Sequence, residues 1–219
     1  MIDFYCERLD ASFWAEPFNA VTNLAFIIAF IVLIPRARAN FPFLEAGERI
    51  VLLAMMALLV AIGVGSSAFH TLANRWSLMA DVGPITLFQL VFLGGYLRYV
   101  VKVSLVTVAI ALISFLVLGT LIGRLPLEVN GSESYLAPLA FVLGLGIYHK
   151  ITNQPSSWML IGAAAVFTVS LSFRTIDNQI CNAFPLGTHF IWHLLNGVVL
   201  YLCVRAFLHS TDRKLAKLT

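Results

Sequence analysis

Residues 50–72 read IVLLAMMALLVAIGVGSSAFHTL, a stretch without a single Asp, Glu, Lys or Arg. An apolar run of about 18 residues or more predicts a helix that crosses a membrane, whereas buried helices of soluble proteins have apolar runs of about 10 to 14 residues. Hydrocarbon offers no partners to backbone N–H and C=O groups, so such a segment must satisfy them internally as a helix. This stretch therefore predicts a membrane-spanning helix.

Six more segments of the same kind lie on either side of it. Hydrophobic residues make up 60% of the 219 residues and charged residues only 11%, against about 25% charged residues in soluble domains. The net charge of +3, without a basic stripe, argues against a nucleic-acid-binding module. We therefore predict an all-α fold, an integral membrane bundle of seven transmembrane helices in a single domain, residues 1–219. The other six segments are 19–35, 79–97, 103–123, 134–149, 156–173 and 185–208.

The basic residues predict how the bundle is oriented. Seven spans place four of the 14 Lys and Arg residues on the side of the N-terminus and ten on the opposite side. Because Lys and Arg accumulate in cytoplasmic loops, we expect the N-terminus outside and the C-terminus in the cytoplasm. The four on the N-terminal side are Arg8, Arg75, Arg124 and Arg174.

Four ionisable residues are predicted to converge at the outer side of this bundle. His70 lies at the end of an outward-running segment, and Asp81 lies at the start of the inward-running segment that follows. His189 and His193 lie in the first turns of the last segment, which also starts outside. Ionisable groups within a span cost at least about 2.5–3.5 kcal/mol each on insertion scales, so their presence needs a reason.

The three histidines predict a zinc site. His189 and His193 are spaced i, i+4, so both imidazoles leave the same face of a helix and can reach one ion. With His70 they form a three-histidine set, which leaves the fourth tetrahedral position of Zn²⁺ open to water, as in catalytic sites. Bound zinc lowers the pKa of water from 15.7 to about 7. The alternative is a pair of histidines that only caps a helix at the membrane interface.

Two further residues, Asp81 and Ser66, are predicted to take part in catalysis beside this ion. Asp81 could orient the water and take its proton, and the Ser66 hydroxyl could hydrogen-bond an oxyanion that forms on an attacked carbonyl. The structural alternatives are that Asp81 pairs with Arg75 or Arg174, and that Ser66, near Gly63 and Gly65, only permits close helix packing. His149 and His209 should lie at the cytoplasmic face, away from the site.

The pattern Ser66-x3-His70-x10-Asp81 with His189-x3-His193 resembles the alkaline ceramidase family, part of a seven-helix hydrolase superfamily that includes the adiponectin and progestin receptors. Two further stretches are similar to the ceramidase branch, and the resemblance spans nearly the whole chain. They are Tyr5-Cys6-Glu7 with residues 15–23 (AEPFNAVTN), and Ile176-Asp177-Asn178 up to Cys181.

This resemblance implies hydrolysis of the amide bond of ceramide to a sphingoid base and a fatty acid. By matching position, His70, His189 and His193 would be the zinc ligands, Ser66 the oxyanion helper and Asp81 the acid or base. A substrate already in the bilayer would reach such a site directly, so the expected partner is a ceramide-like membrane lipid.

The resemblance also implies a calcium site in the N-terminal acidic segment. The oxygen ligands that Ca²⁺ prefers would come from Asp3, Glu7, Glu16 and Asn19. The chain departs from the family pattern there, with Leu9 in place of an Asn and a shorter spacing from Glu7 to Glu16. The alternative is a solvated acidic segment.

The cysteines give a last expectation. Cys6 and Cys181 both fall on the predicted outer side, where an oxidising compartment permits a disulfide, and the resemblance pairs them; two unrelated cysteines are the alternative. Cys203 lies within the last segment and should be a free, buried thiol.

Two other functions stay open at this point. One is a hydrolase of another acyl lipid, an N-acyl amino lipid or a phospholipid. The other is a seven-helix lipid-sensing receptor with the same zinc site, although the short ends, 1–18 and 209–219, leave little room for a partner-binding region. The same short ends suggest a bacterial inner-membrane protein, with no protein partner implied.

Overall fold

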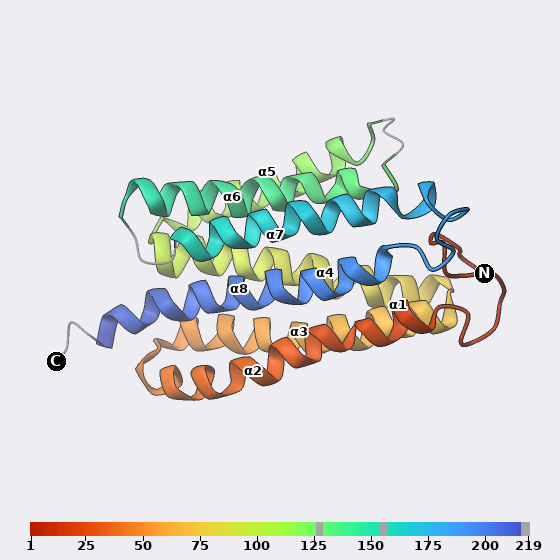
Figure 1. The fold of residues 1–219 in the computed structure, drawn as a ribbon. Helices are drawn as coiled ribbons and strands as arrows, with labels where there is room; N and C mark the ends of the chain where they lie inside the picture. Colours follow the sequence, from red (N-terminus) through yellow and green to blue (C-terminus); the bar gives the residue numbers. More distant parts are fainter. Residues whose placement is uncertain (126–128, 154–156, 216–219) are drawn as a thin grey trace.

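The computed structural model describes residues 1–125, 129–153 and 157–215, and these form an all-helical bundle with no strand among them (Figure 1). Within these described ranges, seven helical stretches are long and apolar enough to cross a membrane, which confirms the predicted number and makes the chain a multi-pass membrane protein. The α-helices are α1 (Pro17–Thr22), α2 (Leu24–Asn40), α3 (Ala46–Leu72), α4 (Arg75–Gly95), α5 (Leu105–Ile122), α6 (Leu136–Ile151), α7 (Ser157–Ile176) and α8 (His189–Leu215). Short helices extend or join them: η1 (Phe41–Phe43), η2 (Tyr96–Val101), η3 (Ser132–Tyr135) and η4 (Asp177–Gln179).

Three helices begin four residues away from the start that hydropathy predicts. α3 starts at Ala46 rather than 50, after a capping box formed by Glu45 and Glu48. α4 starts at Arg75 rather than 79 because the Asn74 side chain accepts the Ser77 N–H, and the Ser77 hydroxyl accepts the Asn74 N–H in return. Asp81 therefore lies in the second turn of α4 and not at its start. α8 starts at His189 rather than 185, after Gly187 with its φ of +65°. Hydropathy does not register caps or left-handed residues, which set these boundaries.

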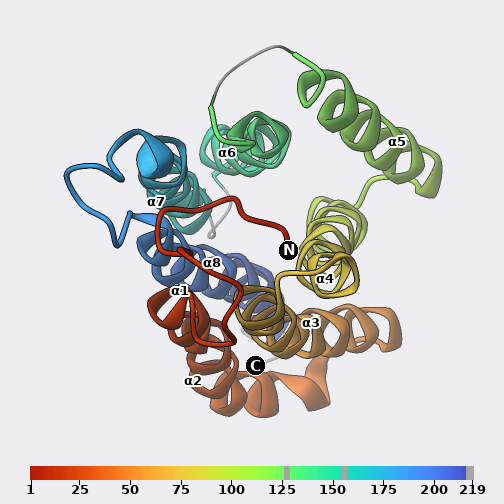
Figure 2. The same ribbon diagram turned by 90° about the vertical axis from the view of Figure 1, so that its right-hand side faces the viewer.

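α8 is the most enclosed span of the bundle. In the most apolar part of its span 56% of residues are buried, against 11% for α5, which lies at the edge (Figure 2). α8 packs between α2 and α7, and its inner face contributes Val204 and Phe207 to the core. His189 and His193 therefore lie on the most buried helix, whose position is fixed by packing against α2 and α7.

Close contact of α3 with α4 depends on Gly65. A Cβ at this position would lie 1.9 Å from the carbonyl oxygen of Ala80. The next residues along the two helices are Ser66 and Asp81, so the missing side chain at Gly65 lets these two approach each other. The stretch around Gly65 therefore does permit close helix packing, as considered from the sequence. The same close packing brings Ser66 and Asp81 together.

The N-terminal arm, residues 1–16, folds back across the end of the bundle (Figure 2). The Ile2 N–H donates to the carbonyl of Ala73 just beyond α3, at 2.8 Å. A disulfide joins Cys6 to Cys181, 175 residues apart, and confirms the predicted pair. Cys203 is buried and free, also as predicted. The arm is thereby fixed over the end of the bundle where α3 ends and α8 begins.

Candidate metal centre

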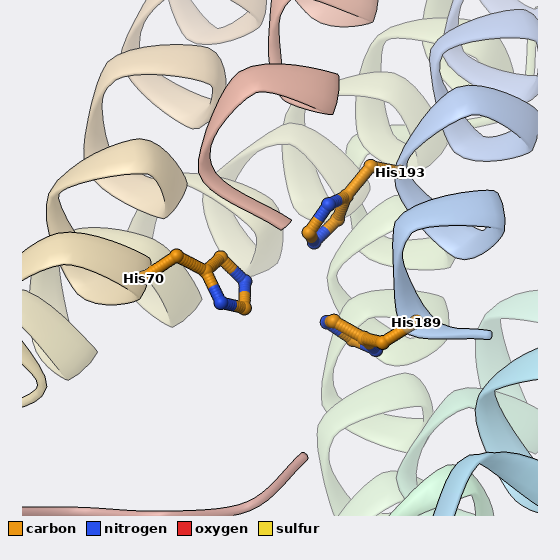
Figure 3. Close-up of side chains that lie close together, drawn as sticks. All are labelled: His70, His189 and His193. Atoms are coloured by element: carbon orange, nitrogen blue, oxygen red, sulfur yellow. The ribbon is translucent and has the colours of Figure 1, made fainter. Parts of the chain in front are cut away.

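Three buried imidazoles meet beneath this arm (Figure 3). His70 comes from the last turn of α3, and His189 and His193 come from the first two turns of α8; each is at most 2% exposed. One ligand atom from each ring lies within 4.8 Å of the other two. Among the described residues, no other group of three His, Cys, Asp or Glu side chains comes together in this way. The structure thus brings together the three histidines that the sequence singles out.

The ring of His70 is oriented by Glu16. Nδ1 of His70 lies 2.5 Å from Oε2 of Glu16, whose other oxygen accepts from the Arg8 guanidinium. Burial acts to raise the pKa of the Glu16 carboxyl, but its contacts with His70 and Arg8 outweigh burial and lower that pKa. An ionised carboxylate can only accept, so Nδ1 of His70 carries a proton, and in the neutral imidazole, the form that binds a metal ion, Nε2 holds the lone pair. Nε2 is buried and has no hydrogen-bond partner among the described residues.

The ring of His193 is oriented by Thr22 at the end of α1. Its Nδ1 lies 3.0 Å from the Thr22 hydroxyl, and that hydroxyl donates to the carbonyl of Phe18 at 2.7 Å. Because a hydroxyl has one proton to donate, Thr22 must accept from the histidine. The lone pair of His193 therefore lies on Nε2, as in His70.

His189 is held by the arm and by the segment that precedes α8. The ring of Tyr5 stacks on its imidazole with centroids 3.5 Å apart. Oδ1 of Asp177 accepts the backbone N–H groups of His189, at 2.9 Å, and of Thr188, while Oδ2 accepts the N–H of Cys6 at 3.1 Å. Burial raises the pKa of the Tyr5 phenol to about 12, so this ring stays uncharged. Asp177 thus fixes both the start of α8 and the arm.

This donor set fits a zinc ion. Four-coordinate zinc bound by nitrogen at 2.0–2.1 Å holds its ligand atoms about 3.3 Å apart, and the three ligand atoms here, within 4.8 Å of one another, need only side-chain adjustment. The buried Nε2 of His70 has no hydrogen-bond partner among the described residues and is therefore available as a metal ligand. Carboxylate and hydroxyl groups behind the imidazoles are the usual outer partners of metal-ligating histidines.

Ser66 and Asp81 face a cavity beside the histidines. The cavity has a volume of about 270 Å³, and His189, His193, Ser66, Asp81 and Arg174 contribute to its lining. Ser66 lies beside the Asp81 carboxylate, whose Oδ1 has no hydrogen-bond partner among the described residues. No ion pair within 4 Å joins Asp81 to Arg75 or Arg174 in the part of the chain that the structure describes, so the pairing considered for Asp81 is not formed.

The four calcium candidates do not form a comparable group. Asp3 is exposed, and the two carboxylate oxygens of Glu7 accept the backbone N–H groups of Phe18 and Asn19. Glu16 is engaged by Arg8 and His70, and Asn19 donates to it at 3.1 Å. These contacts give the calcium site no support, and it stays a prediction.

His149 and His209 lie at the other end of the bundle, as expected. His149 is near the end of α6 and His209 near the end of α8, whereas the site lies where α8 begins (Figure 1). His149 is buried against the ring of Tyr96, with centroids 5.3 Å apart. Neither belongs to the metal-binding cluster.

Several residues of this centre lie in stretches that resemble the family, but the sequence assigns them no role at the ion. Thr22 and Tyr5 are ordinary side chains until the arm folds back, and Glu16 was expected as a calcium ligand rather than as the partner of His70. Asp177 lies 12 residues before His189, too far along the chain for an N-cap pattern to identify it. Arg174 was considered only as a partner of Asp81.

Comparison with known proteins identifies a family for this chain. A family model described as Ceramidase matches residues 4–216, nearly the whole chain. Among curated proteins, none matches the sequence.

Proposed function

The chain belongs to the ceramidase family, and from this premise we propose that it is a zinc-dependent membrane amidohydrolase that cleaves ceramide to a sphingoid base and a fatty acid. Family membership supports a ceramide-hydrolysing activity in general. The observation that carries the zinc dependence is the cluster of three buried imidazoles beside the cavity with Ser66 and Asp81. The orientation, with the N-terminus outside, and the single-domain organisation remain part of this proposal.

His70, His189 and His193 would hold the ion. When bound there, zinc would supply a Lewis acid that polarises the amide carbonyl and eases deprotonation of a water. The chain itself fixes the proton positions on two rings, because Glu16 and Thr22 occupy the Nδ1 atoms of His70 and His193. Both residues therefore keep their Nε2 lone pairs free for the metal.

Asp81 is the group that moves the proton. Its Oδ1 has no hydrogen-bond partner among the described residues and can accept a proton from the attacking water, and Ser66 lies beside the carboxylate. The water oxygen forms a bond to the amide carbon, and the C–N bond then breaks. The proton on Asp81 passes to the leaving nitrogen, so the products are a carboxylic acid and an amine. Ser66 lines the same cavity, and once Asp81 holds the proton the Ser66 hydroxyl can donate to the developing oxyanion.

Apolar walls extend the cavity into the bundle. Phe26, Ile62, Ile85, Tyr135 and Trp192 line both the cavity beside the histidines and a second, almost wholly apolar cavity. A polar reaction centre that continues into an apolar space suits a lipid with a polar amide and a long chain.

The test is to incubate the purified protein with labelled ceramides, N-acyl amino lipids and phospholipids and to identify the products. We expect sphingoid base and fatty acid from ceramide only. Hydrolysis of one of the other lipids would indicate a different acyl-lipid hydrolase, and no product from any of them would favour a lipid-sensing receptor.

A variant separates chemistry from metal binding. Ser66→Ala should lower turnover by about 10²–10³, as loss of one oxyanion donor does elsewhere, while the metal content persists. Loss of the metal instead would give Ser66 a structural role.

A further inference from the structure

Arg174 is a cation that the proposed reaction does not use. It lies near the end of α7 and lines the same cavity as Ser66, Asp81 and two of the histidines. A guanidinium has five N–H donors and stays charged at all physiological pH values. Its single recorded hydrogen bond among the described residues is from Nη1 to the Tyr5 hydroxyl, at 2.9 Å. Nε is buried and has no partner among those residues.

Three aromatic rings hold this guanidinium in place. Its Cζ lies 5.7 Å from the ring centroid of Tyr5, 5.3 Å from that of Tyr135 and 5.4 Å from that of Trp192. The rings come from the N-terminal arm, η3 and α8, so the charge sits where three parts of the chain meet. Ring faces attract a cation and fix its position, but they carry no full negative charge to neutralise it.

The carboxylates around the cavity form no close ion pair with this charge among the described residues. Asp81 and Glu133 both line the cavity. Neither forms an ion pair within 4 Å with the guanidinium in the part of the chain that the structure describes. A charge in a low-dielectric cavity is costly unless a partner of opposite charge is provided. The cavity is large enough for that partner to be part of a ligand.

We propose that Arg174 binds an anionic oxygen group of the lipid, and that it thereby determines which lipids the cavity accepts. The group has two possible sources: an anionic headgroup on the substrate, or the carboxylate of the released fatty acid. This inference rests on the proposed function in that the cavity takes a lipid. Arg174 is a binding and specificity-determining residue and takes no part in bond making.

Binding of simple amphiphiles tests the proposal without hydrolysis. Dodecyl phosphate, dodecanoate and the neutral dodecanol are titrated calorimetrically into the purified protein in neutral detergent. We expect at least one of the two anions to bind at least ~10-fold more tightly than dodecanol, as a charge-assisted hydrogen bond in a desolvated site allows. Arg174→Gln should remove this preference, and Arg174→Lys should keep part of it. Arg75→Gln is the matched control, because Arg75 is exposed at the same end of the bundle and should leave binding unchanged.

Kinetics then separate the two sources. If the headgroup is bound, the wild type should have a lower KM for ceramide 1-phosphate than for ceramide, and Arg174→Gln should lose that difference. If the product is bound, the two substrates should have similar KM values, and inhibition by added fatty acid should weaken about 10-fold in Arg174→Gln.

Two results would overturn the proposal. One is a wild-type protein that binds both anions no more tightly than dodecanol, a result that needs no variant to fold. The other is a folded Arg174→Gln variant with the wild-type preference. Arg174-dependent anion binding without ceramide turnover would instead support the site and count against the proposed reaction alone.

Discussion

At His70 the contact that matters most joins residues 54 positions apart. Glu16 accepts from Nδ1, and the same carboxylate pairs with Arg8, whose Nη2 donates to the carbonyl of His70 at 2.7 Å. One acidic side chain therefore fixes both the ring and the backbone of a candidate ligand. We propose that Glu16 supports the metal centre through His70, a role that does not require calcium.

Glu16→Gln should weaken zinc binding by about 10- to 100-fold, because a neutral amide is a poorer acceptor for the Nδ1 proton of a metal-ligating histidine. Zinc affinity of the purified variant, measured by competition with a chelator, checks this.

Glu7→Gln is the matched control for Glu16→Gln. Glu7 is an acidic residue of the same arm that accepts only backbone N–H groups at the start of α1. Its replacement should leave zinc affinity near the wild-type value. Equal losses in the two variants, or none in either, would show that the contact of Glu16 with His70 does not support the metal.

Helix contacts set the distances between the catalytic candidates. Ser66 and Asp81 meet because α3 and α4 approach closely at Gly65 and Ala80. His189 is placed by the start of α8, where Asp177 accepts the backbone N–H groups of Thr188 and His189 and Gly187 turns the chain with a positive φ. The positions of these candidate groups thus depend on where α4 and α8 begin and on the close contact of α3 with α4 at Gly65.

Gly65→Ala should destabilise the protein by about 1–3 kcal/mol, the usual cost of an extra methyl group in a packed interior. The added Cβ would lie 1.9 Å from a backbone oxygen, so α3 and α4 must separate, and hydrolysis should fall with them. Thermal unfolding in detergent and turnover of ceramide are the measurements.

Gly144→Ala in α6 is the comparison, since a Cβ there has nothing within 4 Å. Alanine favours a helix over glycine by up to about 1 kcal/mol, so this variant should be as stable as the wild type or more so. Similar destabilisation of both variants would mean that the α3–α4 contact is not the critical one.

Over the whole molecule, the Cys6–Cys181 disulfide closes most of the chain into one loop and fixes the arm over the site. Loss of a bridge that closes a long loop typically costs about 2–5 kcal/mol. Cys6→Ser should lower the unfolding midpoint in detergent by a corresponding amount.

A reductant supplies the control for the disulfide prediction. It should lower the midpoint of the wild type towards that of Cys6→Ser and leave the variant unchanged, because the variant has no bridge to break. An equal response of both proteins, or no response in the wild type, would contradict a stabilising bridge.

Much of this architecture could be predicted from the sequence. The seven spans follow from hydropathy, and their alternating directions bring His70, His189 and His193 to the same end of the bundle. The contacts that orient these rings could not be predicted in this way. They depend on how the N-terminal arm folds back over the bundle, and on Asn74 and Asp177, which fix the starts of α4 and α8. A hydropathy pattern carries no information about either. The calcium expectation shows the same limit, because acidic residues in the arm serve as helix and histidine partners.

Zinc content is the most direct test of the central claim. Wild-type protein purified under zinc-replete conditions should contain one zinc ion per chain by elemental analysis. His193→Ala should lose both that zinc and ceramide hydrolysis, whereas His209→Ala, at the far end of the same helix, should keep both. A His193→Ala variant that retains stoichiometric zinc or ceramide hydrolysis would contradict the three-histidine metal centre.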